Sequence, residues 1–176
     1  LFFAITWLPG YLMQTFHINL TSAGLFLMLP WGLSCCTIIL GGYLSDFLCE
    51  RLKSYRIART YLIIACQVIA GLFFIPVVLT HSLNVSVVCL SIAIAMALMP
   101  NAPYYSACSD LHILETGTAT GIMITFFSLS GLISPVLTGY LSDLLGGFDA
   151  PIIILIVLLA TSVVGLFCFN HYPDDN

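Results

Sequence analysis

The chain has 176 residues, of which 60% are hydrophobic and 7% are charged, and its formal net charge is −4. Soluble domains carry about 25% charged residues, so this composition excludes a soluble globular protein and is typical of an integral membrane protein. Four basic residues in the whole chain also exclude a nucleic-acid-binding protein, which needs a basic surface to neutralise phosphates.

Long apolar segments alternate with short polar ones along the chain. A helix needs about 20 mostly apolar residues to cross the hydrocarbon core of a bilayer. We therefore expect six membrane helices, at about 1–16, 23–45, 60–80, 85–109, 117–141 and 151–170. The first segment is short for a crossing, and Pro9-Gly10 interrupts it. The expected fold class is an all-α membrane protein within a lipid bilayer.

The stretch from Gly42 to Arg59, between the second and third segments, contains all four basic residues. Lys and Arg are enriched in cytoplasmic loops, so we expect this stretch to be a cytoplasmic loop of a multi-pass protein of the cell membrane. Six crossings then place both ends of the chain and residues 110–116 in the cytoplasm. They leave residues 17–22, 81–84 and 142–150 outside.

Prolines predict where these helices bend or break. Pro30 predicts a kink in the second segment, and Pro100-Asn101-Ala102-Pro103 predicts a broken helix in the fourth. Backbone groups freed by such a break must find protein, water or ligand as partners.

An internal repeat relates the two halves of the chain. Gly42-Tyr43-Leu44-Ser45-Asp46 ends the second segment, and the identical Gly139-Tyr140-Leu141-Ser142-Asp143 ends the fifth. These segments are the middle helices of two successive triplets. An odd number of crossings per triplet inverts the second copy, and such a 3+3 inverted repeat is typical of secondary transporters.

The residues argue against an enzyme or a metal protein. Seven cysteines lie mostly in apolar runs without metal-ligand spacing, and no cofactor motif is present. Ser128 would need a histidine at similar depth to serve as the nucleophile of an intramembrane protease, but all four histidines lie in polar stretches. A six-helix channel, or a non-transporting membrane protein, remains the alternative to a transporter.

The opening Phe2-Phe3-Ala4-Ile5-Thr6-Trp7-Leu8-Pro9-Gly10-Tyr11-Leu12 is similar to the Phe-Phe-x-x-Thr-Trp-x-Pro-x-Tyr-Leu that begins helix seven in the anion:cation symporter family of the major facilitator superfamily. Gly42-x-Leu44-Ser45-Asp46-x-x-x-x-Arg51-x-Lys53 resembles the loop signature of that superfamily, with Phe47 and Cys49 as departures. The likeness continues through Leu29-Pro30-Trp31, Ser109-Asp110 and Ser134-Pro135-x-x-x-Gly139.

The resemblance implies that the chain is helices seven to twelve, the carboxyl half of a twelve-helix transporter whose amino half is absent. The family carries sugar acids and other organic anions. The implied function is secondary active transport of a small organic anion by alternating access, coupled to a proton or sodium. No Lys or Arg occurs inside the apolar segments, so the resemblance assigns the anion-binding arginine and the coupling carboxylates to the other half.

Polar residues inside the segments are the candidates for the substrate cavity, since polar groups in a membrane face a cavity or another helix. Their helical spacing places them in groups on single faces of the first, fourth and fifth segments. The candidates are Tyr11, Gln14, Trp31, Asn101, Tyr104, Tyr105, Thr125 and Ser128. The resemblance assigns the positions of Tyr104, Tyr105 and Thr125 to the cavity. The competing interpretation is helix packing or an interfacial aromatic belt.

Gly42, Asp46 and Arg51 are the candidates for a conformational loop. The resemblance implies that this loop latches one transport state against neighbouring helix ends. Asp46 is predicted at a helix C-terminus, where a negative charge is unfavourable, so we expect it to have a cationic partner.

Overall fold

A computed structural model describes residues 2–80, 82–110, 116–145, 147 and 149–170. Every regular element within these ranges is an α-helix. The elements are α1 (Phe2–Thr6), α2 (Leu8–Phe16), α3 (Leu20–Leu52), α4 (Tyr55–Leu79), α5 (Leu83–Leu98), α6 (Asn101–Ser109), α7 (Thr116–Leu145) and α8 (Asp149–Asn170). The prediction of an all-helical chain is confirmed for the part that the structure describes.

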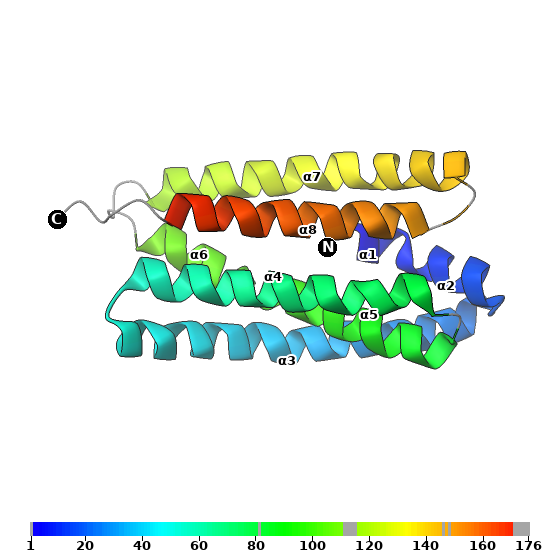
Figure 1. The fold of residues 1–176 in the computed structure, drawn as a ribbon, viewed down its shortest axis with the longest axis horizontal. Helices are drawn as coiled ribbons and strands as arrows, with labels where there is room; N and C mark the ends of the chain where they lie inside the picture. The colour runs from blue at the N-terminus through cyan, green and yellow to red at the C-terminus, as the bar shows by residue number, and fades with distance from the viewer. Residues whose placement is uncertain (1, 81, 111–115, 146, 148, 171–176) are drawn as a thin grey trace.

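The long helices run side by side along the long axis of the molecule (Figure 1). The turn between α3 and α4, the end of α6 and the end of α8 lie at one end. The ends of α2, α4 and α7 lie at the other (Figure 1). The polar stretches therefore alternate between two ends, as expected of a chain that crosses a membrane repeatedly. Which end is cytoplasmic remains a prediction.

Five spans in the described chain are long and apolar enough to cross a membrane. They are Leu20–Leu52, Tyr55–Leu79, Leu83–Ser109, Thr116–Leu144 and Ala150–Cys168. The first expected segment is divided into the short helices α1 and α2, which fall outside this set. The protein is thus a multi-pass membrane protein, while the six-helix inverted repeat stays a prediction.

The long basic loop expected from Gly42 to Arg59 is wrong. The helix α3 continues to Leu52 and α4 begins at Tyr55, so only two residues connect them. Lys53 adopts a left-handed backbone with φ of 53°, and its amide donates to a carbonyl in the last turn of α3. The hydroxyl of Ser54 accepts from the amide of Ile57 and caps α4. Two capped helix ends replace the loop because polar residues remain helical where their terminal backbone groups have partners.

The expected break in the fourth segment is confirmed between α5 and α6. Pro100 and Pro103 have no amide hydrogen, so the carbonyls four residues earlier lose the donors that a continuous helix supplies. The first segment breaks at Trp7 rather than at Pro9-Gly10, because Pro9 lies in the first turn of α2, where its missing amide costs nothing. The helix α3 runs unbroken through Pro30.

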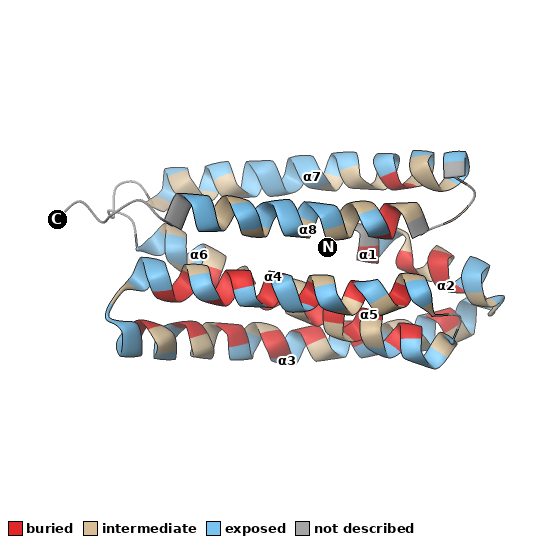
Figure 2. Ribbon diagram, viewed as in Figure 1, coloured by how far each residue is buried: buried red, intermediate tan, exposed pale blue. Residues whose placement is uncertain are grey.

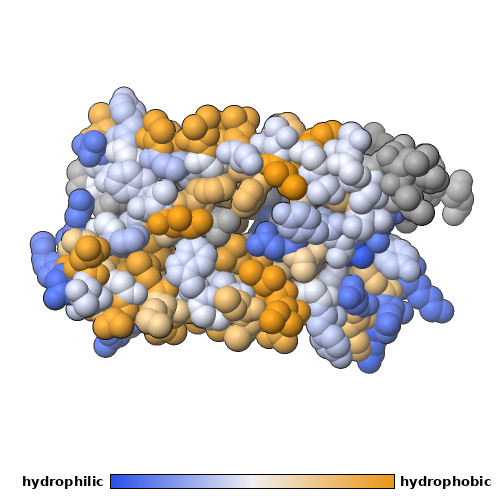
Figure 3. Space-filling model, turned by 180° about the vertical axis from the view of Figure 1, so that it is seen from behind, coloured by the Kyte–Doolittle hydropathy of each residue, from blue (hydrophilic) through white to orange (hydrophobic). Residues whose placement is uncertain are grey.

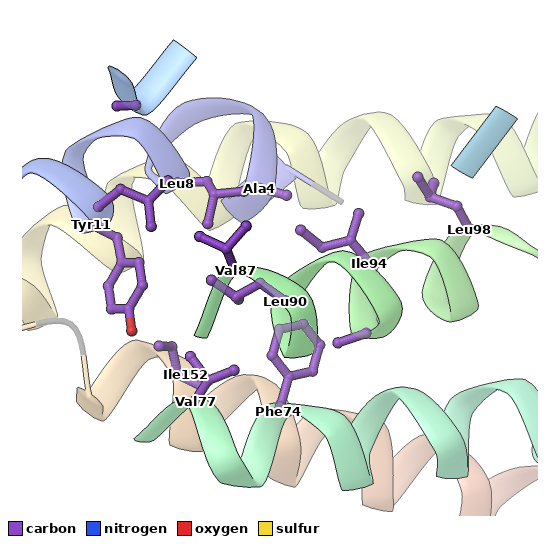
Figure 4. Packing of buried hydrophobic residues seen from close by; sticks show 13 residues of the cluster. Ala4, Leu8, Tyr11, Phe74, Val77, Val87, Leu90, Ile94, Leu98 and Ile152 are labelled. Atoms are coloured by element: carbon purple, nitrogen blue, oxygen red, sulfur yellow. The ribbon is translucent and has the colours of Figure 1, made fainter. Parts of the chain in front are cut away.

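The hydrophobic core lies where α1, α2 and the start of α8 meet α4 and α5. Figure 4 shows side chains such as Leu8, Phe74, Leu90 and Ile152 converging there from four different helices. Figure 2 shows buried residues concentrated on α4 and α5, whereas α7 is exposed along most of its length. In Figure 3, hydrophilic residues gather toward the two ends and hydrophobic ones cover much of the surface between them. The core therefore lies beside α4 and α5, whereas α6 and α7 lie at the surface.

Candidate functional site

The candidate residues of the fourth segment lie just past its break. Asn101 is the first residue of α6 and is half-buried, whereas Tyr105, one turn later, is 50% exposed. Tyr104 is half-buried, and its hydroxyl accepts a hydrogen bond of 3.0 Å from the side-chain amide of Gln67 on α4. After the break, the side chain of Tyr105 is therefore exposed, whereas Tyr104 lies against α4.

Gln67 is a buried polar residue beside the candidate site that the sequence analysis did not single out. It is only 8% exposed, in a helix whose other buried residues are mostly apolar. Its Oε1 is buried without a hydrogen-bond partner among the described residues, and the side chain lines a cavity of about 210 Å³ between α1, α4, α5 and α8. A polar amide in the middle of an apolar span is the signal that could have found it.

The direction of the hydrogen bond decides what Tyr104 can do. The amide of Gln67 donates and the phenol oxygen accepts, so the phenol proton stays available for another acceptor. With the Gln67 amide in this orientation, the Tyr104 hydroxyl can donate to a ligand, and donors are what an oxyanion requires.

The candidates on α7 lie on an exposed helix that contacts α6. Thr125 donates its hydroxyl to the carbonyl of Gly121 at 2.8 Å, and Ser128 is exposed. Because the Thr125 proton is used within its own helix, this hydroxyl offers only acceptor lone pairs to a ligand. The α7 candidates thus differ in chemistry from Tyr104.

The candidates of the first and second segments do not share one environment. Tyr11 is 2% exposed, lies in the core and meets the ring of Phe16 edge-on, with ring centroids 6.1 Å apart. Figure 4 shows its ring directed toward side chains of α4 and α8. Gln14 is exposed, and Trp31 on α3 is half-buried against the core. Helical spacing was expected to place Tyr11 and Gln14 on one face. In the structure, Tyr11 lies in the core and Gln14 lies at the surface.

Trp7 joins the two segments on which the family resemblance rests. Its indole Nε1 donates to the carbonyl oxygen of Pro135 on α7 at 3.1 Å. The same ring lies against Gly139, where a Cβ would stand 3.0 Å from it. The Thr-Trp-x-Pro and Ser-Pro-x-x-x-Gly patterns are thus two sides of one helix contact, between α7 and the break that separates α1 from α2.

The conformational-loop candidates lie at the basic end. Gly42 is half-buried, and a Cβ there would be 3.5 Å from the Ala102 side chain. Asp46 is exposed, and the guanidinium of Arg51 lies 5.1 Å above the ring of Phe47. The cationic partner expected for Asp46 is not found among the residues that the structure describes. An exposed carboxylate can instead be solvated by water.

An ion pair at this end joins Arg59 and Asp110. The Nη1 atom of Arg59 lies 2.6 Å from Oδ2 of Asp110, which connects the start of α4 to the end of α6. Asp110 belongs to the Ser109-Asp110 motif of the family resemblance. That motif is the feature of the sequence that could have pointed to this ion pair.

Comparison with known proteins gives relatives of one kind. No family model matches the chain. The chain is 31% identical to a probable sulfoacetate transporter of Cupriavidus necator, over 94% of its own length and 39% of that protein. It is 27% identical to a hexuronate transporter of Bacillus subtilis, over 85% of the chain and 36% of that protein. It is 30% identical to a probable small intestine urate exporter of Homo sapiens, over 80% of the chain and 29% of that protein. The chain spans about a third of the length of these curated relatives, all of which are transporters and not enzymes.

Proposed function

We propose that the chain belongs to the anion transporters of the major facilitator superfamily and forms helices seven to twelve of a secondary active transporter of a small organic anion. Carboxylates such as sugar acids, and sulfonates, are the substrate classes that the relatives suggest. We propose a proton or sodium as the coupling ion. Alternating access would then move this bundle against a second bundle about a site between them.

One observation carries this proposal: the broken helix at Asn101 presents polar side chains beside the hydroxyl-bearing surface of α7. Tyr105, Thr125 and Ser128 are all exposed on these two helices, which contact each other. Polar groups at membrane depth avoid lipid and face protein or a water-filled cavity. We therefore infer that α6 and α7 border the transport pathway.

Charge complementarity supports a division of the site. Among the described residues, Lys and Arg side chains lie only at the end of α3, in the turn that follows and at the start of α4, where Arg59 is already paired with Asp110. The bundle would thus supply neutral donors, with Tyr104 foremost, and the balancing cation would come from outside this chain. An anion held by neutral donors and one cation is bound less tightly than one paired with several charges, which suits a substrate that must also leave.

Transport by the intact protein that contains this chain tests the proposal. We expect saturable uptake of a carboxylate or sulfonate that structurally related anions compete for. Tyr105→Phe and Thr125→Val should each weaken substrate binding by about 5- to 150-fold, the effect of 1–3 kcal/mol for a buried polar group left unpaired. Membrane abundance should stay unchanged.

Two control variants match these changes closely. Tyr61 on α4 is 51% exposed, so Tyr61→Phe removes an equally exposed hydroxyl from a helix that carries no exposed candidate. Thr161 on α8 is exposed and donates to its own helix at 2.9 Å, as Thr125 does, so Thr161→Val removes the same local bond. If the controls weaken binding as much as the test variants do, the site assignment is wrong. Passive, unsaturable flux of the anion would favour a channel instead.

A further inference from the structure

The cavity of about 210 Å³ between α1, α4, α5 and α8 lies apart from the helices assigned to transport. Neither α6 nor α7 contributes to its described lining. Among the described residues that line it, eight are apolar and two, Gln67 and Ser162, are polar. Its chemistry can therefore be considered separately from the transport site.

The cavity continues the hydrophobic core toward α8. Ala4, Phe74, Ile94 and Leu98 line it and also belong to the core cluster (Figure 4). On α8 its edge is formed by Leu158, which is 61% exposed, and by Ser162, which is exposed as well. Both residues lie within the membrane span Ala150–Cys168. A molecule can thus enter from the α8 side without passing through the aqueous ends of the protein.

The lining excludes an ion as the occupant. None of the described residues that line the cavity is charged. An ion without a countercharge in apolar surroundings loses its hydration with little in return, at a cost of many kcal/mol in its free energy of transfer. The occupant must therefore be neutral, which also rules out the transported anion.

Water is a poor occupant as well. A buried water molecule makes about three hydrogen bonds to polar groups. The Gln67 amide donates to Tyr104 at 3.0 Å, and its Oε1 is buried, so Ser162 is the polar side chain left exposed among the described lining residues. Apolar cavities of about 150 Å³ stay dry and bind benzene. The cavity beside Phe74 is larger than that, so it has room for a molecule with one aromatic ring.

We propose that this cavity binds a small neutral aromatic molecule of about one ring, taken up from the hydrocarbon phase of the bilayer. Phe74 lines the cavity and offers an aromatic partner, and aromatic pairs gain stability beyond the area that they bury. A rigid ring also loses less conformational freedom on binding than the flexible end of an acyl chain does. The site depends on the packing of the four helices and not on the proposed transport function.

Photolabelling with 3-phenyl-3-(trifluoromethyl)diazirine tests the proposal on the intact protein in phosphatidylcholine vesicles. Light expels N₂, and the carbene inserts into neighbouring bonds, which mass spectrometry locates. We expect labelling around Ile94 and Leu159 to saturate as the concentration of the reagent rises. Labelling of Leu72, which is 59% exposed on α4 and lies outside the cavity, should rise in proportion to that concentration. Unlabelled trifluoromethylbenzene at about ten times its Kd should suppress the saturable labelling about tenfold.

Filling the cavity distinguishes a bound reagent from one dissolved in lipid. Ala97→Phe adds a ring at a lining position of α5 and should remove the saturable labelling. Ala65→Phe makes the same change at an exposed position of α4 outside the cavity and should leave the labelling unchanged. Ser162→Phe repeats the test at the exposed edge, where a larger side chain leaves the core packing intact. Ala160→Phe, also exposed on α8 but outside the cavity, is its control.

The outcomes separate binding, folding and the kind of ligand. Loss of saturable labelling in a variant with native circular dichroism, while its control keeps it, supports the site. If Ala97→Phe does not fold, Ser162→Phe decides. Labelling around Ile94 that rises in proportion to concentration, as at Leu72, would overturn the proposal, as would saturable labelling that survives in every folded variant. Suppression by decane as strong as that by trifluoromethylbenzene would overturn the aromatic assignment and give the cavity to acyl chains.

Discussion

Gly41 on α3 provides the most direct test of how the broken helix is held. It is buried, and α3 approaches the break there so closely that a Cβ at Gly41 would overlap the carbonyl oxygen of Met99. The same Cβ would lie 2.9 Å from the Met99 Cγ and 3.1 Å from its carbonyl carbon. The carbonyl of Met99 is one of those that lose their usual donor, because residue 103 is proline. The missing side chain of Gly41 thus makes room for a backbone group displaced by the break.

The expected magnitude combines two opposing effects. Alanine at position 41 gains about 1 kcal/mol of helix propensity over glycine. The overlap costs about 1–3 kcal/mol, at the upper end here because a backbone carbonyl cannot rotate away as a side chain does. We therefore expect Gly41→Ala to lower the free energy of unfolding by up to about 2 kcal/mol. Gly42→Ala is the control, since its Cβ would meet the Ala102 side chain at an ordinary 3.5 Å. It should be neutral or stabilise the protein by up to about 1 kcal/mol.

Denaturant titration of both purified variants in one detergent, followed by circular dichroism, gives the comparison. The prediction concerns the difference between neighbours in one helix, so errors common to both variants cancel. Equal stability of Gly41→Ala and Gly42→Ala would refute the close contact between α3 and the break. A lower stability of Gly42→Ala would mean that the two helices pack in a different register.

Three further predictions follow, two on single contacts and one on membrane topology. Trp7→Phe removes one hydrogen bond to α7 and should lower the free energy of unfolding by about 0.5–1.5 kcal/mol in the same titration, so an unchanged value would count against that bond. Gln67→Leu should weaken substrate binding about 2- to 10-fold in the intact transporter but add little in a Tyr104→Phe background, and additive effects would show that the two residues act separately. Cysteines introduced by Glu50→Cys and Ser82→Cys should react with an impermeant reagent from opposite sides of the membrane, and reaction from one side alone would contradict the alternating topology.

Five of the six expected segments overlap spans of the described chain that are long and apolar enough to cross a membrane, because an apolar run of that length has few other stable states. The sequence predicted the helix ends poorly. The helix α3 was expected at 23–45 but covers Leu20–Leu52, and its polar last turns are stabilised by caps that no hydropathy pattern contains. Cys49, expected in a loop, is for the same reason a buried residue of α3.

The candidate site was predicted only in part, and the reason differs from that for the helix ends. Spacing indicates which residues share a helix face, but it does not indicate which helix that face meets. Tyr11 was expected beside Gln14, yet the neighbouring helices bury it in the core. Gln67 and Tyr104 are 37 positions apart, and Trp7 and Pro135 are 128 apart. Partners at such separations depend on the arrangement of helices, which a single sequence does not contain.

The division of the fourth span connects these findings. Upstream of the break, α5 has many buried residues and packs against α3 and α4, so it is anchored in the core. Downstream, only Pro103 of α6 is buried, and the helix lies among α3, α4 and α7 with Asn101 and Tyr105 toward the surface. If the helix were continuous, the buried face of α5 would extend through Asn101 and Tyr105. The two prolines break the helix before that face reaches them, and Gly41 allows α3 to approach the break closely. Polar groups can therefore stand at membrane depth on a helix whose other half is core, which is the combination that a transport pathway through a bundle requires.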